Sequence, residues 1–473
     1  MNPADRHTEN QTRTGGVLSR RSVLRTGGAT VAAGLAGCTL PGGDDEADET
    51  AALQSCPIDV EESPAEYRTH PDDDVRLWRG GLRRLGYYPE ETVPDSVSVN
   101  WSFPLNYDGH TAAKSSPVPT PDGERIVFAG DTGRVDAYTP AGRHRWSTHT
   151  GATDMGFHGS AAIVDGVAYI GGYNGDLYAI VVDSGELVWH TTSEDLGGAL
   201  AIGSSPAYYE GILYVVVEYW DPSSGALWAI DAETGDPIHV DDRMWGQPHP
   251  SATIDLQEGR LITGSNDGAV YCWKFPCLEF AWKFQTGPEG GPDGKTKADG
   301  EFSLGAEVKG TAPTFDGRVY VGSWDQHLHC LDIADGEELW SFETGNIVMS
   351  NPAADPNEGV VYVGSADHNV YALDAESGEK LWSTNVDGRV NGSLTATEQT
   401  VLVGSSGSYL YALDKETGDP RWRVENRGYV TSAAVPLDGR IYYAERAVLD
   451  GYYDDTMDTE LVEPGHAYCL VED

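Results

Sequence analysis

Five polar residues stand at equivalent places in a motif that recurs along this sequence, directly ahead of small residues. They are Lys114 (KSSP), His158 (HGSA), His249 (HPSA), Lys309 (KGTA) and Asn391 (NGSL). Ammonium, imidazole and amide groups that converged on one point would attract a carboxylate or another anion. The residue types therefore raise the hypothesis of a small-anion site. The simpler interpretation is that these side chains pair with nearby Asp and Glu or extend into solvent.

The cysteines do not form a recognisable metal or catalytic pattern. The chain has six, and none of their spacings resembles a zinc site. Cys272, Cys330 and Cys469 fall where the repeats described below have Ala, which indicates small buried positions. Cys272 and Cys277 share one hairpin, and their spacing leaves open whether they form a disulfide. We predict no catalytic residue and no metal ligand.

The acidic residues of the turns have a structural explanation. Asp325, Asp367 and Asp374 each stand close to a turn, where an Asp side chain accepts hydrogen bonds from its own backbone. A denser acidic stretch lies at 447–465, but it lacks the Asp-x-Asp-x-Asp-Gly order of a calcium loop. We predict that this stretch is a solvated loop.

The elements that must position these residues are short strands in a repeat. Residues 371–382 (YALDAESGEKLW) and 411–422 (YALDKETGDPRW) are nearly the same string, an alternating run, a Gly-containing acidic turn and a second run that ends in Trp. This pattern predicts a β-hairpin. A further strand pair precedes each hairpin, with runs such as VYVGS at 319–323 and 361–365. Each repeat thus contains four strands.

The closing Trp residues give the number of repeats. Seven positions of the repeat keep Trp, and His239 occupies the eighth; neighbouring positions are 40 to 58 residues apart. The tryptophans are Trp101, Trp146, Trp189, Trp282, Trp340, Trp382 and Trp422. This period with four strands per unit is typical of propeller blades. Trp101 has no preceding strands, while the residues after 431 supply strands without a closing Trp. We predict an all-β, eight-bladed propeller over residues 96–473, closed by pairing of its N- and C-terminal strands.

The N-terminal part of the chain has the pattern of an export signal. Arg20 and Arg21 form a twin-arginine motif, and a small, apolar segment leads to Cys38, as in a lipoprotein signal. We predict a signal peptide over 1–37, a lipidated Cys38 with an acidic stalk over 38–55, and a clasp over 56–95 that packs across the ring. The twin-arginine route would export a folded protein, which the lipid would then hold on the outer face of the cell membrane.

The charge of the chain restricts its partners. The formal net charge is −44, with acidic residues in nearly every loop. Molar salt would screen the resulting repulsion, and this composition is typical of haloarchaeal proteins. Binding to nucleic acid or to an anionic lipid surface is disfavoured by the same charge.

The repeats resemble the PQQ-like, quinoprotein-type β-propeller repeat, which combines an alternating strand, an Asp, a Gly turn and a closing Trp. This resemblance covers residues 76–473 and implies that each Trp docks between neighbouring blades. One branch of the superfamily consists of pyrroloquinoline quinone-dependent dehydrogenases, which use calcium and an adjacent Cys-Cys pair. This sequence has no adjacent cysteines. Lipoproteins similar to BamB, which help to assemble outer-membrane proteins without catalysis, form another branch.

The length, the lipid anchor and the missing cysteine pair favour the BamB-like branch, which requires no cofactor. A haloarchaeal cell has no outer membrane, so what this resemblance implies is a tethered propeller that binds a protein partner at the cell surface. Two alternatives stay open. One is an oxidoreductase that uses pyrroloquinoline quinone with calcium, and the other is an extracellular module that binds a solute in the central channel.

Overall fold

The computed structural model describes residues 74–108, 115–153, 155–220, 223–287, 306–450 and 460–473. All of them belong to the compact unit Cys56–Asp473. The predicted signal, Arg20, Arg21, the lipidation site Cys38 and the stalk lie outside these residues, as does Lys114. Within the described ranges, no helix is both long and apolar enough to cross a membrane.

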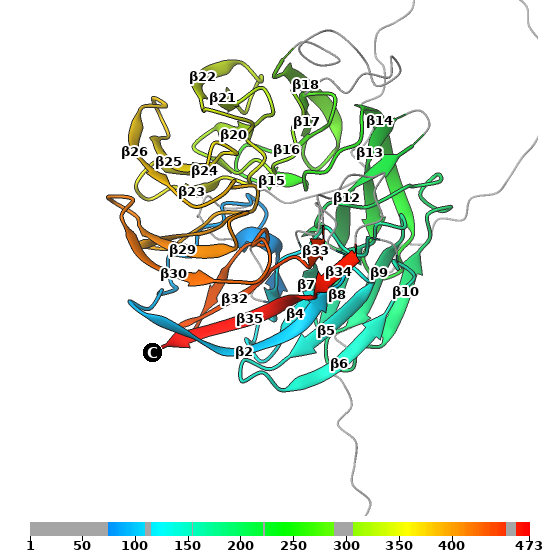
Figure 1. Cartoon of the computed structure of the whole chain (residues 1–473). Helices are drawn as coiled ribbons and strands as arrows, with labels where there is room; N and C mark the ends of the chain where they lie inside the picture. Colours follow the sequence, from blue (N-terminus) through cyan, green and yellow to red (C-terminus); the bar gives the residue numbers. More distant parts are fainter. Residues whose placement is uncertain (1–73, 109–114, 154, 221–222, 288–305, 451–459) are drawn as a thin grey trace, which may run out of the picture. The chain divides into compact units, whose positions relative to one another are not determined.

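Eight sheets are arranged in a ring (Figure 1), and seven of them have four strands in the described residues. We number the blades from the first complete one along the chain. The strands of blades 1 to 4 are β3 (Val118–Pro119), β4 (Ile126–Ala129), β5 (Arg134–Tyr138), β6 (His144–His149), β7 (Ala162–Val164), β8 (Val167–Gly171), β9 (Leu177–Val181), β10 (Leu187–Thr191), β11 (Ala207–Tyr209), β12 (Ile212–Tyr219), β13 (Ser224–Asp231), β14 (Pro237–Trp245), β15 (Thr253–Asp255), β16 (Arg260–Gly264), β17 (Ala269–Lys274) and β18 (Glu279–Gln285).

Blades 5 to 7 follow the same order, from the axis outward. Their strands are β19 (Thr314–Phe315), β20 (Arg318–Gly322), β21 (His327–Asp332), β22 (Glu338–Glu343), β23 (Ala353–Asp355), β24 (Val360–Gly364), β25 (Asn369–Asp374), β26 (Lys380–Asn385), β27 (Thr395–Ala396), β28 (Thr400–Gly404), β29 (Tyr409–Asp414) and β30 (Pro420–Glu425).

Blade 8 joins the two ends of the propeller, as predicted. Its strand order is β31 (Val435–Leu437), β32 (Arg440–Ala444), β35 (Gly465–Glu472) and β2 (Val97–Asn106). Trp101 on β2 lies opposite Cys469 on β35. A two-stranded ribbon of β33 (Val448–Asp450) and β34 (Glu460–Glu463) interrupts this blade. The sheet that contains both ends of the propeller closes the ring, which confirms the predicted eight-bladed fold.

The hairpin of blade 6 explains why the repeat string folds this way. β25 is buried between neighbouring blades, whereas β26 alternates between exposed and half-buried residues. Asp374 accepts hydrogen bonds from the backbone N–H and the hydroxyl of Ser377, which holds the turn. The pairing of the two strands contains a bulge: Ala372 pairs with Trp382, but the next residue, Leu373, pairs with Lys380. The bulge leaves Leu381 without a partner across the ladder and 55% exposed.

The seven closing tryptophans lie at blade interfaces. Each indole N–H donates to a backbone carbonyl of the next blade or its edge, at 2.6 to 3.3 Å, from Trp101 to Pro140, Trp146 to Val182, Trp189 to Ala232, Trp282 to Ile333, Trp340 to Ala375, Trp382 to Lys415 and Trp422 to Pro94. The turn glycine of the next blade packs against the face of the indole ring. A Cβ on Gly378, which has a φ of 73°, would come within 2.7 Å of Trp340.

The interface of blades 3 and 4 is built differently, where His239 replaces Trp. Here Trp273 of blade 4 donates its indole N–H to Asp241 of blade 3 at 2.9 Å. The guanidinium of Arg243 lies 4.2 Å from the centre of the Phe280 ring. This interface therefore keeps an indole hydrogen bond but reverses its direction between the blades.

The described cysteines settle one open question. Cys272, Cys330 and Cys469 are free and buried, whereas Cys277 is disulfide-bonded. Cys272 and Cys277 therefore do not pair with each other. Burial raises the pKa of the Cys272 and Cys330 thiols to about 12, so both are protonated and unreactive at neutral pH.

The segment before β2 crosses one end of the ring. It begins with β1 (Val75–Arg76), which pairs with β7, and the short 3-10 helix η1 (Trp78–Gly80). Its carbonyls then accept hydrogen bonds from backbone N–H groups in the innermost strand regions of blades 4, 5, 6 and 7 in turn. The pairs, donor first, are Ile254 to Leu82, Thr314 to Arg83, Ala354 to Leu85 and Ala396 to Gly86. We call the described part of this segment, residues 74–95, the clasp.

Candidate binding surfaces at the mouth of the propeller

A belt of hydroxyl and amide side chains links the blades around the axis. The third residue of each motif from KSSP to NGSL accepts a hydrogen bond from the preceding blade, at 2.6 to 2.9 Å. The acceptors are Ser116, Ser160, Ser205, Ser251, Thr311, Asn351 and Ser393, and the series begins at the backbone N–H of Ala433 in blade 8. The belt holds the residues before each innermost strand in place around one end of the channel, which we call the mouth. The clasp contacts this belt, since Trp78 Nε1 donates to Ser116 Oγ at 3.1 Å and Arg84 Nη2 donates to the Ser205 carbonyl at 3.2 Å.

Two of the predicted anion-site residues lie on either side of a small cluster. The ring of His158 lies against Tyr173, with 3.7 Å between ring centres. His249 Nδ1 lies 3.2 Å from Glu218 Oε1, and this carboxylate is almost fully buried. A Cβ on Gly203 would lie 2.8 Å from Glu218 Oε1, 3.6 Å from His249 Nδ1 and 3.7 Å from the Tyr173 ring, so these three side chains lie around the same glycine.

The other predicted residues do not join this cluster. Lys309 Nζ lies 2.8 Å from Glu307 Oε2 and 4.3 Å from the centre of the Trp324 ring. Asn391 is half-buried, and its Oδ1 is buried without a hydrogen-bond partner. Lys114 lies outside the described residues. Two of the predicted cationic groups, His249 and Lys309, are thus each paired with a neighbouring Glu, which is the simpler interpretation of their role.

The structure reveals a second ring of mouth residues that the sequence interpretation missed. These residues occupy the second position after the end of the second strand in most blades. They are Asp131, Tyr173, Glu218, Asn266, Trp324, Ala366, Ser406 and Arg446. Three of them contact residues of the predicted anion site: Tyr173 packs against His158, Glu218 pairs with His249, and Trp324 lies against Lys309. Aligning the repeats on their second strand, instead of on the closing Trp, would have found this ring.

Arg446 is the cation of this second ring. Its side chain is 6% exposed, and its Nε donates to Thr431 Oγ1 at 3.0 Å. Its Nη2 is buried and has no hydrogen-bond partner. Burial lowers the pKa of this guanidinium to about 10, so Arg446 remains charged at neutral pH.

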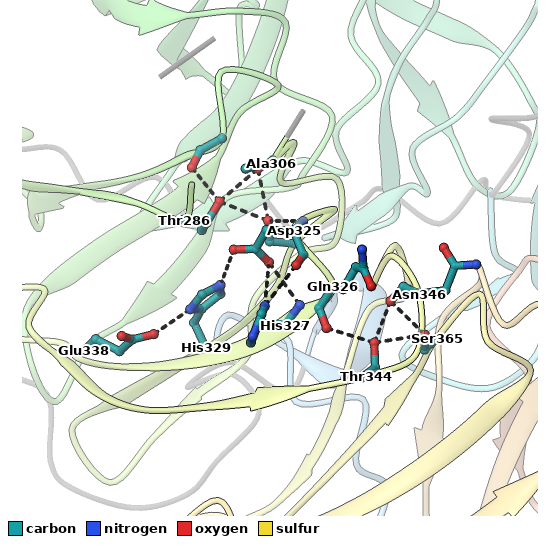
Figure 2. A network of polar contacts seen from close by, with 12 residues as sticks. Thr286, Ala306, Asp325, Gln326, His327, His329, Glu338, Thr344, Asn346 and Ser365 are labelled. Atoms are coloured by element: carbon teal, nitrogen blue, oxygen red, sulfur yellow. Dashed lines mark hydrogen bonds and ion pairs between the residues drawn. The ribbon is translucent and has the colours of Figure 1, made fainter. Parts of the chain in front are cut away.

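A polar network in blade 5 explains the acidic turn residues (Figure 2). Asp325 Oδ2 lies 2.9 Å from His329 Nε2, and Glu338 Oε1 lies 2.7 Å from His329 Nδ1. At the equivalent place in blade 6, the Tyr371 hydroxyl donates to Asp367 Oδ2 at 2.6 Å. His329 is 5% exposed and takes the place of that Tyr. The network therefore holds the hairpin of blade 5 together.

The outer end of blade 3 presents a different surface. β12, β13 and β14 are longer than their counterparts in the other complete blades, and Trp220 and Trp245 at this end are 68% and 76% exposed. Ser224 pairs with both Tyr219 and Trp245, so the two tryptophans lie at the same end of the sheet. The backbone N–H of Leu200, 37% exposed, donates to the Glu218 carbonyl nearby. We call Leu200, Trp220 and Trp245 the blade 3 tip.

The blade 3 tip is not a product of the repeat. Four of the other exposed apolar residues have an origin in the repeat, because each is the extra residue of the bulge that precedes the docking position. They are Val188, Ile238, Leu339 and Leu381. Trp220 and Trp245 have no such origin. Large exposed aromatic residues that the fold does not require are typical of binding surfaces.

The family of the chain follows from a comparison with known proteins. The family model described as outer membrane protein assembly factor BamB matches residues 131–274, 279–423 and 350–451, which is more than half of the chain. The chain belongs to this family. The BamB of Moranella endobia is 23% identical over 267 residues, which are 53% of this chain and 64% of that protein. The alignment thus spans less than two thirds of the relative's length.

Solved structures support the fold alone, because their sequences are distant. The quinohemoprotein alcohol dehydrogenase of Comamonas testosteroni has a TM-score of 0.67 at 14% identity, over 84% of this chain and 80% of that chain. The BamB of Moraxella catarrhalis has a TM-score of 0.55 at 16% identity, over 80% of this chain and 98% of that chain. Both kinds of protein share the propeller, so the fold does not distinguish between them.

Calcium-dependent quinoproteins hold their metal ion with several oxygen ligands. Among the described residues, no group of three or more His, Cys, Asp and Glu side chains lies close enough together to hold a metal ion. The mouth carboxylates Glu218 and Glu307 lie against His249 and Lys309.

Proposed function

We propose that the protein is a non-catalytic scaffold of the cell surface that binds a protein partner at the blade 3 tip. The family supports a role in assembly, since its description names an assembly factor. The proposal rests on the exposure of Trp220 and Trp245. Tryptophans that become buried when two proteins bind supply much of the binding energy. With a net charge of −44, the scaffold is expected to favour a partner with a basic rim.

The experiment compares two pairs of exposed apolar residues in the full chain. A Trp220→Ala/Trp245→Ala variant is purified from its own cells after chemical cross-linking, beside a Leu339→Ala/Leu381→Ala control. We expect a partner that co-purifies with the wild type and the control and is lost from the tip variant. Equal recovery of the same partner with all three proteins would place binding elsewhere and overturn this assignment.

The site of action proposed here is the outer face of the cell membrane. It rests on Arg20 and Arg21 as the export motif and on Cys38 as the lipid-bearing thiol. Arg20→Lys/Arg21→Lys is expected to leave the protein in the cytoplasm, and Cys38→Ser to release it into the medium. Membrane-bound Cys38→Ser protein would contradict the anchor. The acidic composition supports a haloarchaeal, high-salt setting, which loss of structure on dialysis from molar KCl would test.

A quinone-dependent oxidoreductase is the alternative function. Quinoproteins share the propeller with the BamB family, so the fold leaves this function open. Incubation with pyrroloquinoline quinone and calcium, followed by gel filtration and an absorbance scan, separates the two functions. Stoichiometric quinone in the protein peak would establish the alternative. A colourless peak is the result expected for the scaffold.

A further inference from the structure

Cys277 forms a disulfide with a cysteine that lies outside the described residues. The chain has six cysteines, and three of them are free and buried, namely Cys272, Cys330 and Cys469. Cys277 itself is disulfide-bonded. The two cysteines that remain are Cys38 and Cys56, so one of these supplies the other sulfur atom.

Two observations select Cys56 as the partner. Cys56 is the first residue of the compact unit that contains Cys277, whereas Cys38 precedes this unit. Cys38 is also the thiol to which we assign the lipid, and a sulfur in a thioether cannot form a disulfide. We propose that Cys56 and Cys277 form a disulfide that ties the end of the stalk to blade 4. The second of these arguments rests on the proposed membrane anchor, and the first does not.

The turn that contains Cys277 differs from the turns of the other repeats. In blade 6 the Ser377 hydroxyl donates to Asp374 at 2.7 Å, and the Thr at the same position of blades 3 and 7 makes the same bond at 3.2 and 3.1 Å. Cys277 occupies this position in blade 4, and Lys274 replaces the Asp. Blade 4 therefore lacks the hydrogen bond that closes this turn elsewhere, and its Cys is used in a covalent bond instead.

The residues around Cys277 hold its turn firmly in place. The backbone N–H of Phe275 donates to the Gly259 carbonyl at 2.9 Å, which joins this turn to the turn between β15 and β16. The Phe275 ring packs against Tyr209 and Tyr214 of blade 3, with 5.4 and 5.3 Å between ring centres. Cys277 itself is half-buried. The turn thus presents its sulfur from a fixed position beside the interface of blades 3 and 4.

The disulfide determines where the stalk joins the propeller. In blade 3, the turn that corresponds to the Cys277 turn joins β13 and β14, and Trp220 and Trp245 lie at the opposite end of these strands. The stalk is therefore attached at the end of the sheets opposite to the blade 3 tip, which leaves the tip clear of it. The chain between Cys38 and Cys56 spans at most about 60 Å, so the lipid stays within this distance of blade 4.

Formation of this disulfide requires an oxidant. The bond joins the sulfur atoms of Cys56 and Cys277, and their two protons and two electrons pass to a disulfide of a thiol–disulfide oxidoreductase, which becomes a dithiol. Disulfides of this kind form and persist in oxidising environments outside the cytosol. The cross-link therefore supports the proposed position on the outer face of the membrane.

The test is alkylation of the denatured mature protein with iodoacetamide without reduction, followed by peptide mass mapping. Cleavage after Lys274 and after Glu49 separates each of the two cysteines from its neighbouring cysteine. We expect one linked pair of peptides, with Cys56 and Cys277, that reduction splits. Alkylation of both residues in the unreduced protein would overturn the disulfide. A link between Cys277 and Cys38 would overturn both this pairing and the lipid anchor.

Serine variants locate the bond, because Ser is the residue that the repeat has at this turn position in blade 6. Cys56→Ser is expected to make Cys277 alkylatable without reduction, and Cys277→Ser should do the same for Cys56. Cys330→Ser, at a free cysteine, is the matched control and should keep the link. Cys38→Ser should also keep the link while losing the membrane anchor, so the two proposals fail separately. Cys277 that stays protected in Cys56→Ser, or becomes alkylatable in Cys38→Ser, would contradict the pairing.

Discussion

Buried arginines lie at two places along the propeller axis, in the clasp and beside the mouth, and they differ in their hydrogen bonding. In the clasp, Arg84 donates to the carbonyls of Trp78, Ala252, Ser205 and Pro206. Arg79 donates to the carbonyls of Arg84, Leu394 and Pro352. Both side chains are fully buried, yet no side-chain nitrogen of either is left without a partner in the described residues.

Beside the mouth, the buried Arg446 has fewer hydrogen bonds than the clasp arginines. Arg446 has one hydroxyl partner and an unpaired Nη2. Burial lowers the pKa at both places, to about 10 for Arg79 and Arg446, and to about 9 for Arg84, where Arg79 adds its charge. The difference therefore lies in hydrogen bonding and not in burial. The clasp arginines therefore link several blades, whereas the Arg446 side chain makes a single hydrogen bond, to Thr431.

Removing a clasp arginine has the largest expected effect. Arg84→Met would leave four carbonyl oxygens of the axis buried without a donor, and we expect unfolding to become easier by about 3–5 kcal/mol. Urea unfolding measures this difference. Arg145→Met, at an exposed bulge position, should change the same free energy by less than about 0.5 kcal/mol. A loss of under about 1 kcal/mol in Arg84→Met would contradict a structural role for the clasp arginines.

A substitution in the belt that links neighbouring blades should give the next largest effect. Ser251→Ala removes the acceptor of the Ser205 backbone N–H, a bond of 2.8 Å between blades 3 and 4. Leaving this buried donor unpaired should cost about 1–3 kcal/mol of unfolding free energy. The same measurement on Ser377→Ala, a turn residue that bonds to Asp374, serves as the local control. Equal losses in both variants would indicate that the belt adds nothing beyond an ordinary turn bond.

The fold was predictable because its determinants are local and periodic. Hairpins such as 371–382 carry their strand pattern, turn and closing Trp within twelve residues, and the incomplete terminal repeats indicated how the ring closes. The clasp was recognisable only as a segment outside the period. That Arg79 and Arg84 point to main-chain carbonyls of four blades depends on contacts between residues more than 100 positions apart, which no local pattern contains.

The candidate sites were predicted less well, for the same physical reason. Lys309 and Glu307 are close in sequence, and their pairing was one of the interpretations considered. The partner of His249 is Glu218 on the preceding blade, which alignment on the closing Trp did not bring into register. Arg446 lies in the terminal blade, where the repeat pattern is weakest. The tip residues Trp220 and Trp245 extend beyond the repeat, so the period could not indicate them.

Arg446 should respond to substitution in the opposite way to Arg84. Arg446→Met removes a buried charge with an unpaired Nη2, together with one side-chain hydrogen bond to Thr431. We expect the free energy of unfolding to change by less than about 1 kcal/mol or to increase. Urea unfolding of the wild type and the variant measures this difference. Destabilisation as large as that of Arg84→Met would remove the contrast between the two arginines.

The smallest expected effect is a pH dependence that belongs to neither arginine. Burial lowers the pKa of His329, but the hydrogen bonds and charges of Asp325 and Glu338 outweigh burial and raise it above the ordinary value of 6.5. The stabilisation from the imidazolium is therefore fully present below pH 6.5, and it is lost as the pH rises through the raised pKa of the folded state. His329→Tyr restores the Tyr–Asp pair of blade 6, which does not titrate in this range. The unfolding free energy of the wild type relative to His329→Tyr should fall with rising pH, by under about 1 kcal/mol. A difference that stays constant across this pH range would mean that His329 is neutral in the folded protein.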